Sequence, residues 1–132
     1  MTGVELHPLT LREDARGWVA MFSDPLPPMS GLHLPHLRPG TVRGNHLHPD
    51  AAEHLVVVHG VCRLVCADPT SGKVEEYRLT APPALRVSLA PGIAHAVHNI
   101  GTDDLLLLCY HPQPAVGEGI TTLRHPLIDL PA

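Results

Sequence analysis

Aromatic residues are scarce in this chain, at 3% of its 132 residues. Apolar residues nevertheless make up 44%, which excludes a disordered chain and leaves Val, Leu and Ile to form the core. The length suits a single domain. No apolar run reaches the roughly 20 residues of a membrane-spanning helix, so we expect no membrane partner. The first eleven residues lack the apolar stretch of a signal peptide, which predicts a cytoplasmic protein.

An excess of basic charge is also missing. The formal net charge is −4, and Lys and Arg form no block. Binding to nucleic acid needs clustered cations that neutralise phosphates, so we expect no nucleic-acid partner. Cysteines are few: Cys62, Cys66 and Cys109. Cys62 and Cys66 would lie about 13 Å apart on one strand, too far for a disulfide, and we expect reduced, buried thiols.

Proline and glycine are plentiful instead, with 15 and 11 residues. They favour many short elements joined by turns and argue against long helices. We expect strands at 18–22, 31–37, 42–48, 53–59, 61–67, 73–79, 84–89, 95–99 and 104–110. Short strands with regular turn signals are typical of all-β proteins, and a jelly roll of two sheets is the expected fold.

Two of these runs, 55–58 and 105–108, are apolar on both faces. A strand with one wet face should alternate between apolar and polar residues. Continuous apolar sequence predicts burial on both sides, and in so small a chain the second cover is expected to come from another subunit. We therefore expect a homodimer. The single tryptophan, Trp18, is expected to pack in the core.

Histidine is unusually frequent, with eleven residues. His46 and His48 are two apart, so they project from the same face of a strand. Glu53 opens the next strand after a turn, and His95 follows a distant Pro-Gly turn. Three neutral imidazoles and one carboxylate are a suitable ligand set for zinc, iron, manganese, nickel or copper. We expect His46, His48, Glu53 and His95 to hold one metal ion.

The same residues resemble the first motif of the cupin superfamily. That motif reads Gly, five residues, His, one, His, four, Glu, six, Gly, and it is matched by Gly40, His46, His48, Glu53 and Gly60. The second cupin motif has a Pro/Gly turn, a His and an Asn, matched at 91–99. The resemblance implies a double-stranded β-helix, or jelly-roll cupin barrel, as one domain over 1–132. Its parts would be N-terminal strands at 1–38, a motif core at 40–99, and a C-terminal strand and tail at 100–132. It also implies one divalent metal per chain, with zinc favoured and iron, manganese or nickel compatible.

Two further segments resemble cupins that act on sugar nucleotides. These are Asp-Ala-Arg-Gly-Trp at 14–18 and Val-Arg-Gly-Asn-His-Leu-His at 42–48. Similar segments occur in dTDP-4-keto-6-deoxyglucose 3,5-epimerases, in 3,4-ketoisomerases and in the zinc-containing C-terminal cupin of capsule-synthesis reductases. The resemblance implies an epimerase or isomerase with a carbohydrate-like ligand, a keto-sugar nucleotide. It also implies that Arg43 binds the diphosphate, although strict alternation places Arg43 and His46 on opposite faces unless Gly44 allows a bulge.

The spacing of the motifs does not by itself identify the catalytic acid and base. In the metal-free epimerases the histidine that matches His46 is the base and a tyrosine is the acid, which leaves Tyr110 and Tyr77 as acids here. If His46 holds a metal, another group must be the base, and His36, His111 or Glu118 are the alternatives. His33 and His36 are three apart on one expected strand, so we expect one of them to line the barrel mouth.

The same residues are compatible with two other functions. An oxygenase that uses iron or manganese could employ the same three histidines and glutamate, because such a site leaves positions open for oxygen. A non-enzymatic cupin could bind a small ligand and act as a regulator, since fold alone does not fix function.

Overall fold

The structure, a computed structural model, describes residues 1–22, 29–112 and 120–129. In these ranges the chain is all-β, which confirms the expected class. The strands are β1 (Val4–Pro8), β2 (Thr10–Asp14), β3 (Gly17–Met21), β4 (Ser30–His33), β5 (His36–Leu37), β6 (Val42–Leu47), β7 (Glu53–His59), β8 (Val61–Ala67), β9 (Val74–Thr80), β10 (Leu85–Leu89), β11 (Ala94–Asn99), β12 (Leu105–His111) and β13 (Leu123–Arg124). The described segments contain no helix that could cross a bilayer.

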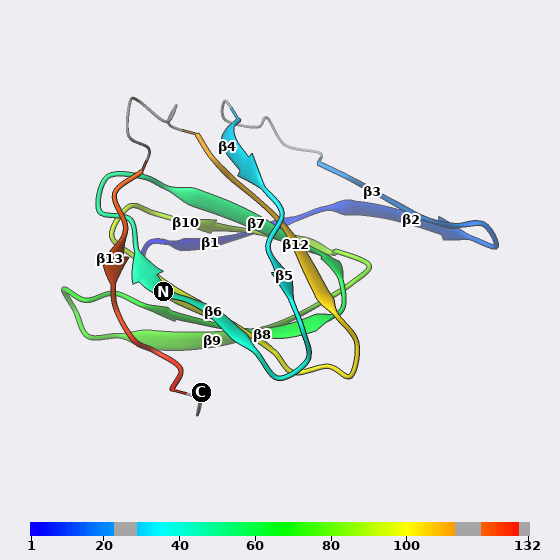
Figure 1. The fold of residues 1–132 in the computed structure, drawn as a ribbon. Coiled ribbons are helices and arrows are strands. Elements are labelled where there is room, and N and C mark those ends of the chain that lie inside the picture. Colours follow the sequence, from blue (N-terminus) through cyan, green and yellow to red (C-terminus); the bar gives the residue numbers. More distant parts are fainter. Residues whose placement is uncertain (23–28, 113–119, 130–132) are drawn as a thin grey trace.

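Two antiparallel sheets face each other across the core (Figure 1). One has the order β1-β10-β7-β12-β4, with β5 also paired to β12, and the other has the order β13-β6-β11-β8-β9. Neighbours in a sheet are mostly distant in sequence, as in a jelly roll. This arrangement brings the start of β7 close to the end of β6 and the start of β11.

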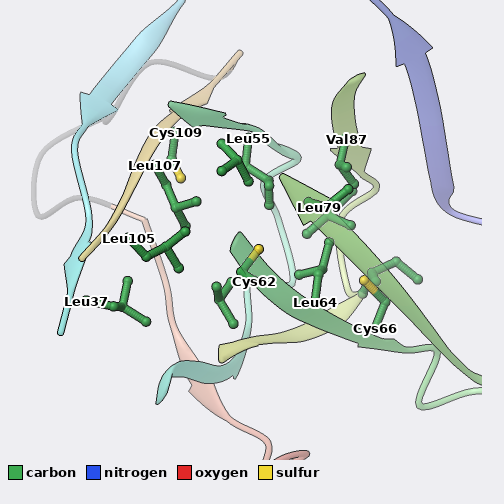
Figure 2. Close-up of a cluster of buried hydrophobic side chains, with 14 residues drawn as sticks. Leu37, Leu55, Cys62, Leu64, Cys66, Leu79, Val87, Leu105, Leu107 and Cys109 are labelled. Carbon is green, nitrogen blue, oxygen red and sulfur yellow. The ribbon is translucent and has the colours of Figure 1, made fainter. Parts of the chain in front are cut away.

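Aliphatic side chains and the three cysteines fill the space between the sheets (Figure 2). Leu64, Cys62 and Leu105 have no measurable exposure. All three cysteines are free and buried, as expected, and burial raises the pKa of the Cys62 and Cys66 thiols to about 12. Leu, Val and Cys side chains therefore form the core, in which aromatic residues are few.

The expected strands agree with the structure best in the motif core, where β7 and β8 have the expected bounds. The expected strand at 31–37 is divided into β4 and β5 around Leu34 and Pro35. Strands β1, β2 and β13 were not expected. The sequences of β2 and β13 show no clear apolar alternation, although Val4 and Leu6 alternate with Glu5 and His7 in β1. Strand β13 belongs to a segment that runs along β6 and places Ile128 against Val65 and Ala96.

The apolar run at 55–58 is largely buried within one chain, whereas Leu106 and Leu108 of the run at 105–108 are half-buried. Val56 is 3% exposed and Leu55 is 2% exposed within one chain, so their burial does not require another subunit. The expectation for Trp18 was wrong: it lies on the hairpin formed by β2 and β3, and it is 39% exposed. This hairpin projects away from the two sheets (Figure 1).

Candidate metal centre

Glu53 is the centre of the expected metal site. It begins β7, lies 6% exposed, and faces the gap between the sheets. His95 in β11 pairs in register with His46 in β6, and His48 follows directly after β6. The four side chains converge as the spacing predicted, and their ligand atoms all lie within 4.8 Å of one another.

A bulge in β6 sets the direction of these side chains. The pairing of β6 with β11 shifts between His95 and Ala96, and Gly44 and Asn45 have φ values of 94° and 56°. A Cβ at Gly44 would lie 2.8 Å from the His95 carbonyl oxygen, so a larger residue does not fit. Because of this bulge, Arg43 and His46 both line the pocket, which strict alternation would forbid.

Backbone carbonyls orient two of the imidazoles. His48 Nδ1 lies 3.2 Å from the Thr121 carbonyl oxygen, and His95 Nδ1 lies 3.2 Å from that of Ile93. An N–H on Nδ1 can donate to each carbonyl, which leaves the Nε2 lone pair directed at Glu53. The Nε2 atoms of His95 and His48 lie 2.7 and 3.7 Å from Glu53 Oε2.

These contacts fit a cation better than a set of hydrogen bonds. Glu53 Oε2 is buried and accepts no hydrogen bond of good geometry, although His95 Nε2 is close to it. With Nδ1 protonated, His95 Nε2 would present a lone pair to a carboxylate oxygen. A buried polar atom without a partner is costly, and a positive ion between these donors would satisfy it. Three imidazole nitrogens and one carboxylate oxygen are donors for zinc, iron or manganese.

The protonation states also suit metal binding. Burial and, to a smaller extent, the positive charges of His95 and His48 lower the pKa of His46 to about 4. Burial alone would raise the pKa of Glu53, but the close approach of His33 and His95 holds it well below its usual range. At neutral pH the set therefore consists of a neutral imidazole at His46 and an ionised carboxylate, the forms that bind a metal.

The four residues lie in a pocket of about 800 Å³, a size that accommodates a small-molecule ligand. Arg43 and His36 lie on its wall, where Arg43 Nε donates to the His36 carbonyl oxygen at 3.0 Å. His36 Nε2 lies 3.1 Å from Asp104, and its side chain is half exposed. His36 thus lines the mouth of the pocket but points its imidazole to a surface carboxylate.

Neither tyrosine lies in the pocket, which corrects the expectation for the acid. Tyr110 follows Cys109 in β12, and since Cys109 faces the pocket, alternation directs Tyr110 to the other face of the sheet. There its ring stacks on His54, with centroids 4.9 Å apart. Tyr77 lies on β9, where its hydroxyl donates to Glu75 at 2.5 Å. Glu118, another candidate, lies outside the described residues.

The structure adds His33 to the site. His33 Nε2 lies 3.5 Å from Glu53 Oε1, and His111 Nε2 lies 4.0 Å from the same oxygen. The two imidazole rings are stacked, with centroids 5.6 Å apart. The sequence signalled that one of His33 and His36 faces the mouth, but both line the pocket because the chain turns between β4 and β5.

Known proteins with similar sequences place this chain in a family. The family model for the polysaccharide biosynthesis C-terminal domain matches residues 12–114. The chain is 31% identical over 72 residues to a UDP-2-acetamido-2,6-beta-L-arabino-hexul-4-ose reductase of Pseudomonas aeruginosa. That match covers 54% of the chain but 19% of the reductase, so the chain corresponds to a small part of its relative.

Solved structures share the fold at low sequence identity. A dTDP sugar isomerase from Desulfovibrio desulfuricans G20 superposes with a TM-score of 0.82 and 18% identity, over 95% of this chain and 85% of that chain. ChmJ, a 3'-monoepimerase from Streptomyces bikiniensis in complex with dTDP-quinovose, gives 0.73 and 22%, over 83% and 64%. The capsular polysaccharide assembling protein CapF from Staphylococcus aureus gives 0.69 and 22%, over 91% and 35%. The chain therefore belongs to the polysaccharide biosynthesis C-terminal domain family and has a cupin fold like that of the sugar-nucleotide epimerases and isomerases.

Proposed function

We propose that this cupin is a metal-dependent isomerase or epimerase of a keto-sugar nucleotide. The observation that carries the proposal is the convergence of His46, His48, His95 and Glu53 on one point, with further histidines beside them in an open pocket. The structural relatives named for epimerase or isomerase activity share this fold. A divalent ion held by these four residues, with zinc favoured, would supply a Lewis acid that stabilises the enolate formed when the proton next to the ketone is removed.

His111 is placed to remove the proton next to the ketone. Its Nδ1 lies 2.8 Å from the Ala52 carbonyl oxygen, so Nδ1–H donates there and Nε2 keeps its lone pair. That Nε2 faces the pocket near Glu53. A neutral imidazole held in this way can act as a general base near neutral pH.

His33 is placed to return the proton. Its contact with Glu53 raises the pKa of this imidazole above its usual value, despite partial burial. His33 and His111 stack on one another, so the proton would leave and return on the same side of the sugar. Removal and return of the proton on one side supports an isomerisation, in which the proton moves between neighbouring carbons. Epimerisation would instead need the proton to return to the opposite face of the same carbon.

Arg43 is the proposed contact for the diphosphate. Only its Nε is engaged by the His36 carbonyl, and the residue is exposed on the pocket wall. The two terminal nitrogens of a guanidinium can bind phosphate oxygens as a fork. The nucleotide would then lie at the mouth and the sugar would reach Glu53.

We also propose a homodimer, on grounds that differ from the apolar runs. In the described part of the chain, β2 and β3 hydrogen-bond only to each other, and their apolar side chains are largely exposed. Trp18, Val19 and Met21 are 39%, 59% and 39% exposed. An isolated two-stranded hairpin is marginally stable in water, so a second copy of the chain is the proposed cover for this arm.

The test is solvent-proton exchange in a keto-sugar nucleotide. The metal-loaded protein is incubated in deuterium oxide with a UDP- or dTDP-4-keto sugar, and the carbons that acquire deuterium are located by NMR. Deuterium beside the ketone, lost in His111→Gln, supports the proposal. Absence of exchange with every such sugar would overturn it. Oxygen uptake by the iron-loaded protein would instead favour an oxygenase, and ligand binding without turnover would favour a regulatory cupin.

A further inference from the structure

The pocket holds more metal-ligating groups than one ion uses. Glu53 Oε2 faces the first set of histidines, but Oε1 faces His33 at 3.5 Å and His111 at 4.0 Å. Cys109 faces the same space, and its sulfur lies within 4.8 Å of ligand atoms of His33 and Glu53. We propose that His33, His111, Cys109 and Glu53 Oε1 form a second divalent-metal site, bridged to the first by the Glu53 carboxylate.

The orientation of the imidazoles supports this site. His33 Nδ1 lies 2.6 Å from the Gly31 carbonyl oxygen, and His111 Nδ1 lies 2.8 Å from that of Ala52. When these imidazoles are neutral, each Nδ1–H donates to the backbone, and each Nε2 lone pair faces Glu53 Oε1. This is the arrangement of His48 and His95 in the first site, repeated on the other side of the same carboxylate, and it is the usual second contact of a metal-bound histidine.

The spacing of the donors matches one small ion. Zinc binds nitrogen and oxygen at about 2.0–2.2 Å, so two such ligands in a tetrahedron lie about 3.4 Å apart. The distances from His33 and His111 to Oε1 are 3.5 and 4.0 Å, which differ from this value by a few tenths of an ångström. A carboxylate that offers one oxygen to each ion is compatible with two metals about 3.5–4 Å apart.

The thiol of Cys109 determines which class of metal ion the second site would bind. A thiolate is a soft ligand, so the second site should take zinc, cobalt or cadmium in preference to magnesium or calcium. Binding replaces the S–H bond with a sulfur–metal bond and releases one proton to solvent, with no change in oxidation state. The first site contains no sulfur, so a sulfur–metal bond is diagnostic of the second.

Occupation of the second site would regulate the first. Under the proposed function, on which this consequence alone rests, the Nε2 atoms of His33 and His111 handle the substrate proton. An ion bound to both lone pairs would remove the base and the acid together. The second site would therefore be inhibitory and would fill only when the supply of metal exceeds what the first site takes.

Cobalt titration of the full chain, stripped of metal and kept reduced, tests the site. The expected result is two equivalents per chain, with a thiolate-to-cobalt charge-transfer band that grows with the second equivalent. His33→Ala should lose the second equivalent and keep the first. The His33 side chain is 43% exposed, so the fold should tolerate the change. Cys109→Ser should lose the band. Saturation of the wild type at one equivalent without the band, or an undiminished second equivalent in His33→Ala, would overturn the proposal.

A variant of the first site separates this proposal from the proposed function. His46→Ala with His48→Ala removes two ligands of the first ion and none of the second. Retention of one equivalent and of the charge-transfer band in this variant supports an independent second site. Loss of the band there, with retained folding by circular dichroism, would show that cobalt has no separate sulfur-containing site. Neither outcome depends on whether the protein acts on a sugar.

Discussion

Glu53 and His54 are neighbours in β7 and face opposite sides of the same sheet. Glu53 points into the pocket among histidines, whereas His54 accepts a hydrogen bond from Arg86 at 3.0 Å and lies 2.7 Å from Ser88 Oγ. The alternation of a β-strand thus separates two polar clusters by a single residue. Substitutions on the two sides should affect different properties, the first metal binding and the second stability.

Glu53→Gln should sharply reduce metal content. The amide is nearly the same size as the carboxylate but carries no charge, so it is a poorer ligand for a divalent ion. Loss even of groups that only orient a ligand costs about 10–100-fold in affinity, and loss of a ligand should cost at least as much. Elemental analysis and zinc titration measure the effect. Glu76→Gln is the matched control, because Glu76 pairs with Arg63 on the surface. Equal zinc affinity in the two variants would contradict a role for Glu53.

Acidification should destabilise the metal-free protein between about pH 6.5 and 4. The pKa values of His46 and His54 are lowered from 6.5 to about 4, mainly by burial, and then by His95 and by Arg86 respectively. In this window the unfolded chain binds protons that the folded chain resists, so the free energy of unfolding falls as the pH falls. His33, whose pKa is raised, opposes this trend in part.

Urea unfolding at pH 7 and at pH 5 measures this dependence. The double variant His46→Gln with His54→Gln should show a smaller loss of stability on acidification than the wild type, because it lacks the two lowered groups. If the wild type were equally stable at both pH values, the assignment of neutral, buried imidazoles to these positions would be incorrect.

The buried Arg86 cluster should contribute strongly to stability. Arg86 is 2% exposed and donates through Nη1 to His54 Nδ1 and to Ser88 Oγ. Arg86→Ala removes these hydrogen bonds and leaves a cavity, and we expect a loss of about 3 kcal/mol in the free energy of unfolding. Arg78→Ala, at an exposed position of β9, should change it by less than about 0.5 kcal/mol. Similar values for both variants would contradict the prediction.

The sequence could predict a site residue only where the residues that interact are close along the chain or belong to a recognised motif. His46 and His48 could be placed together because strand periodicity is local, and the motif spacing brought Glu53 and His95 to them. His33 could not be assigned in this way. Its approach to Glu53 depends on β12 pairing both with β4 and with β7. Cys109 lies opposite His33 and Leu55, which are 76 and 54 residues away in the sequence.

Tyr110 illustrates a different limit. It was a candidate acid because the chain has two tyrosines and the related chemistry uses one. Composition cannot show the face on which a side chain lies, and a one-residue difference from Cys109 placed Tyr110 outside the pocket. The cupin fold and the four metal candidates were therefore easier to predict than the acid and the base.

The projecting hairpin should mediate dimerisation. Val19→Asp introduces a charge at an apolar position of β3, and it should shift the sedimenting species from a dimer towards the 14.2 kDa monomer. Val74→Asp is the matched control, since Val74 is similarly exposed, at 55%, but lies on β9. A wild-type protein that sediments as a monomer at micromolar concentration would exclude the dimer, and a dimer unaffected by Val19→Asp would exclude this hairpin as its interface.

The last prediction compares two residues that are adjacent in β12 but face opposite sides of the sheet. His111→Gln removes the proposed base, and a general base contributes about 10²–10⁴-fold to a rate, so kcat for exchange should fall by at least about 100-fold while zinc affinity at Glu53 is kept. Tyr110→Phe should leave kcat within about twofold, because the hydroxyl lies behind the sheet beside His54. Tyr110→Phe should instead change the free energy of unfolding. A large loss of kcat in Tyr110→Phe, with unchanged stability and an active His111→Gln, would restore the tyrosine as the acid and exclude His111 as the base.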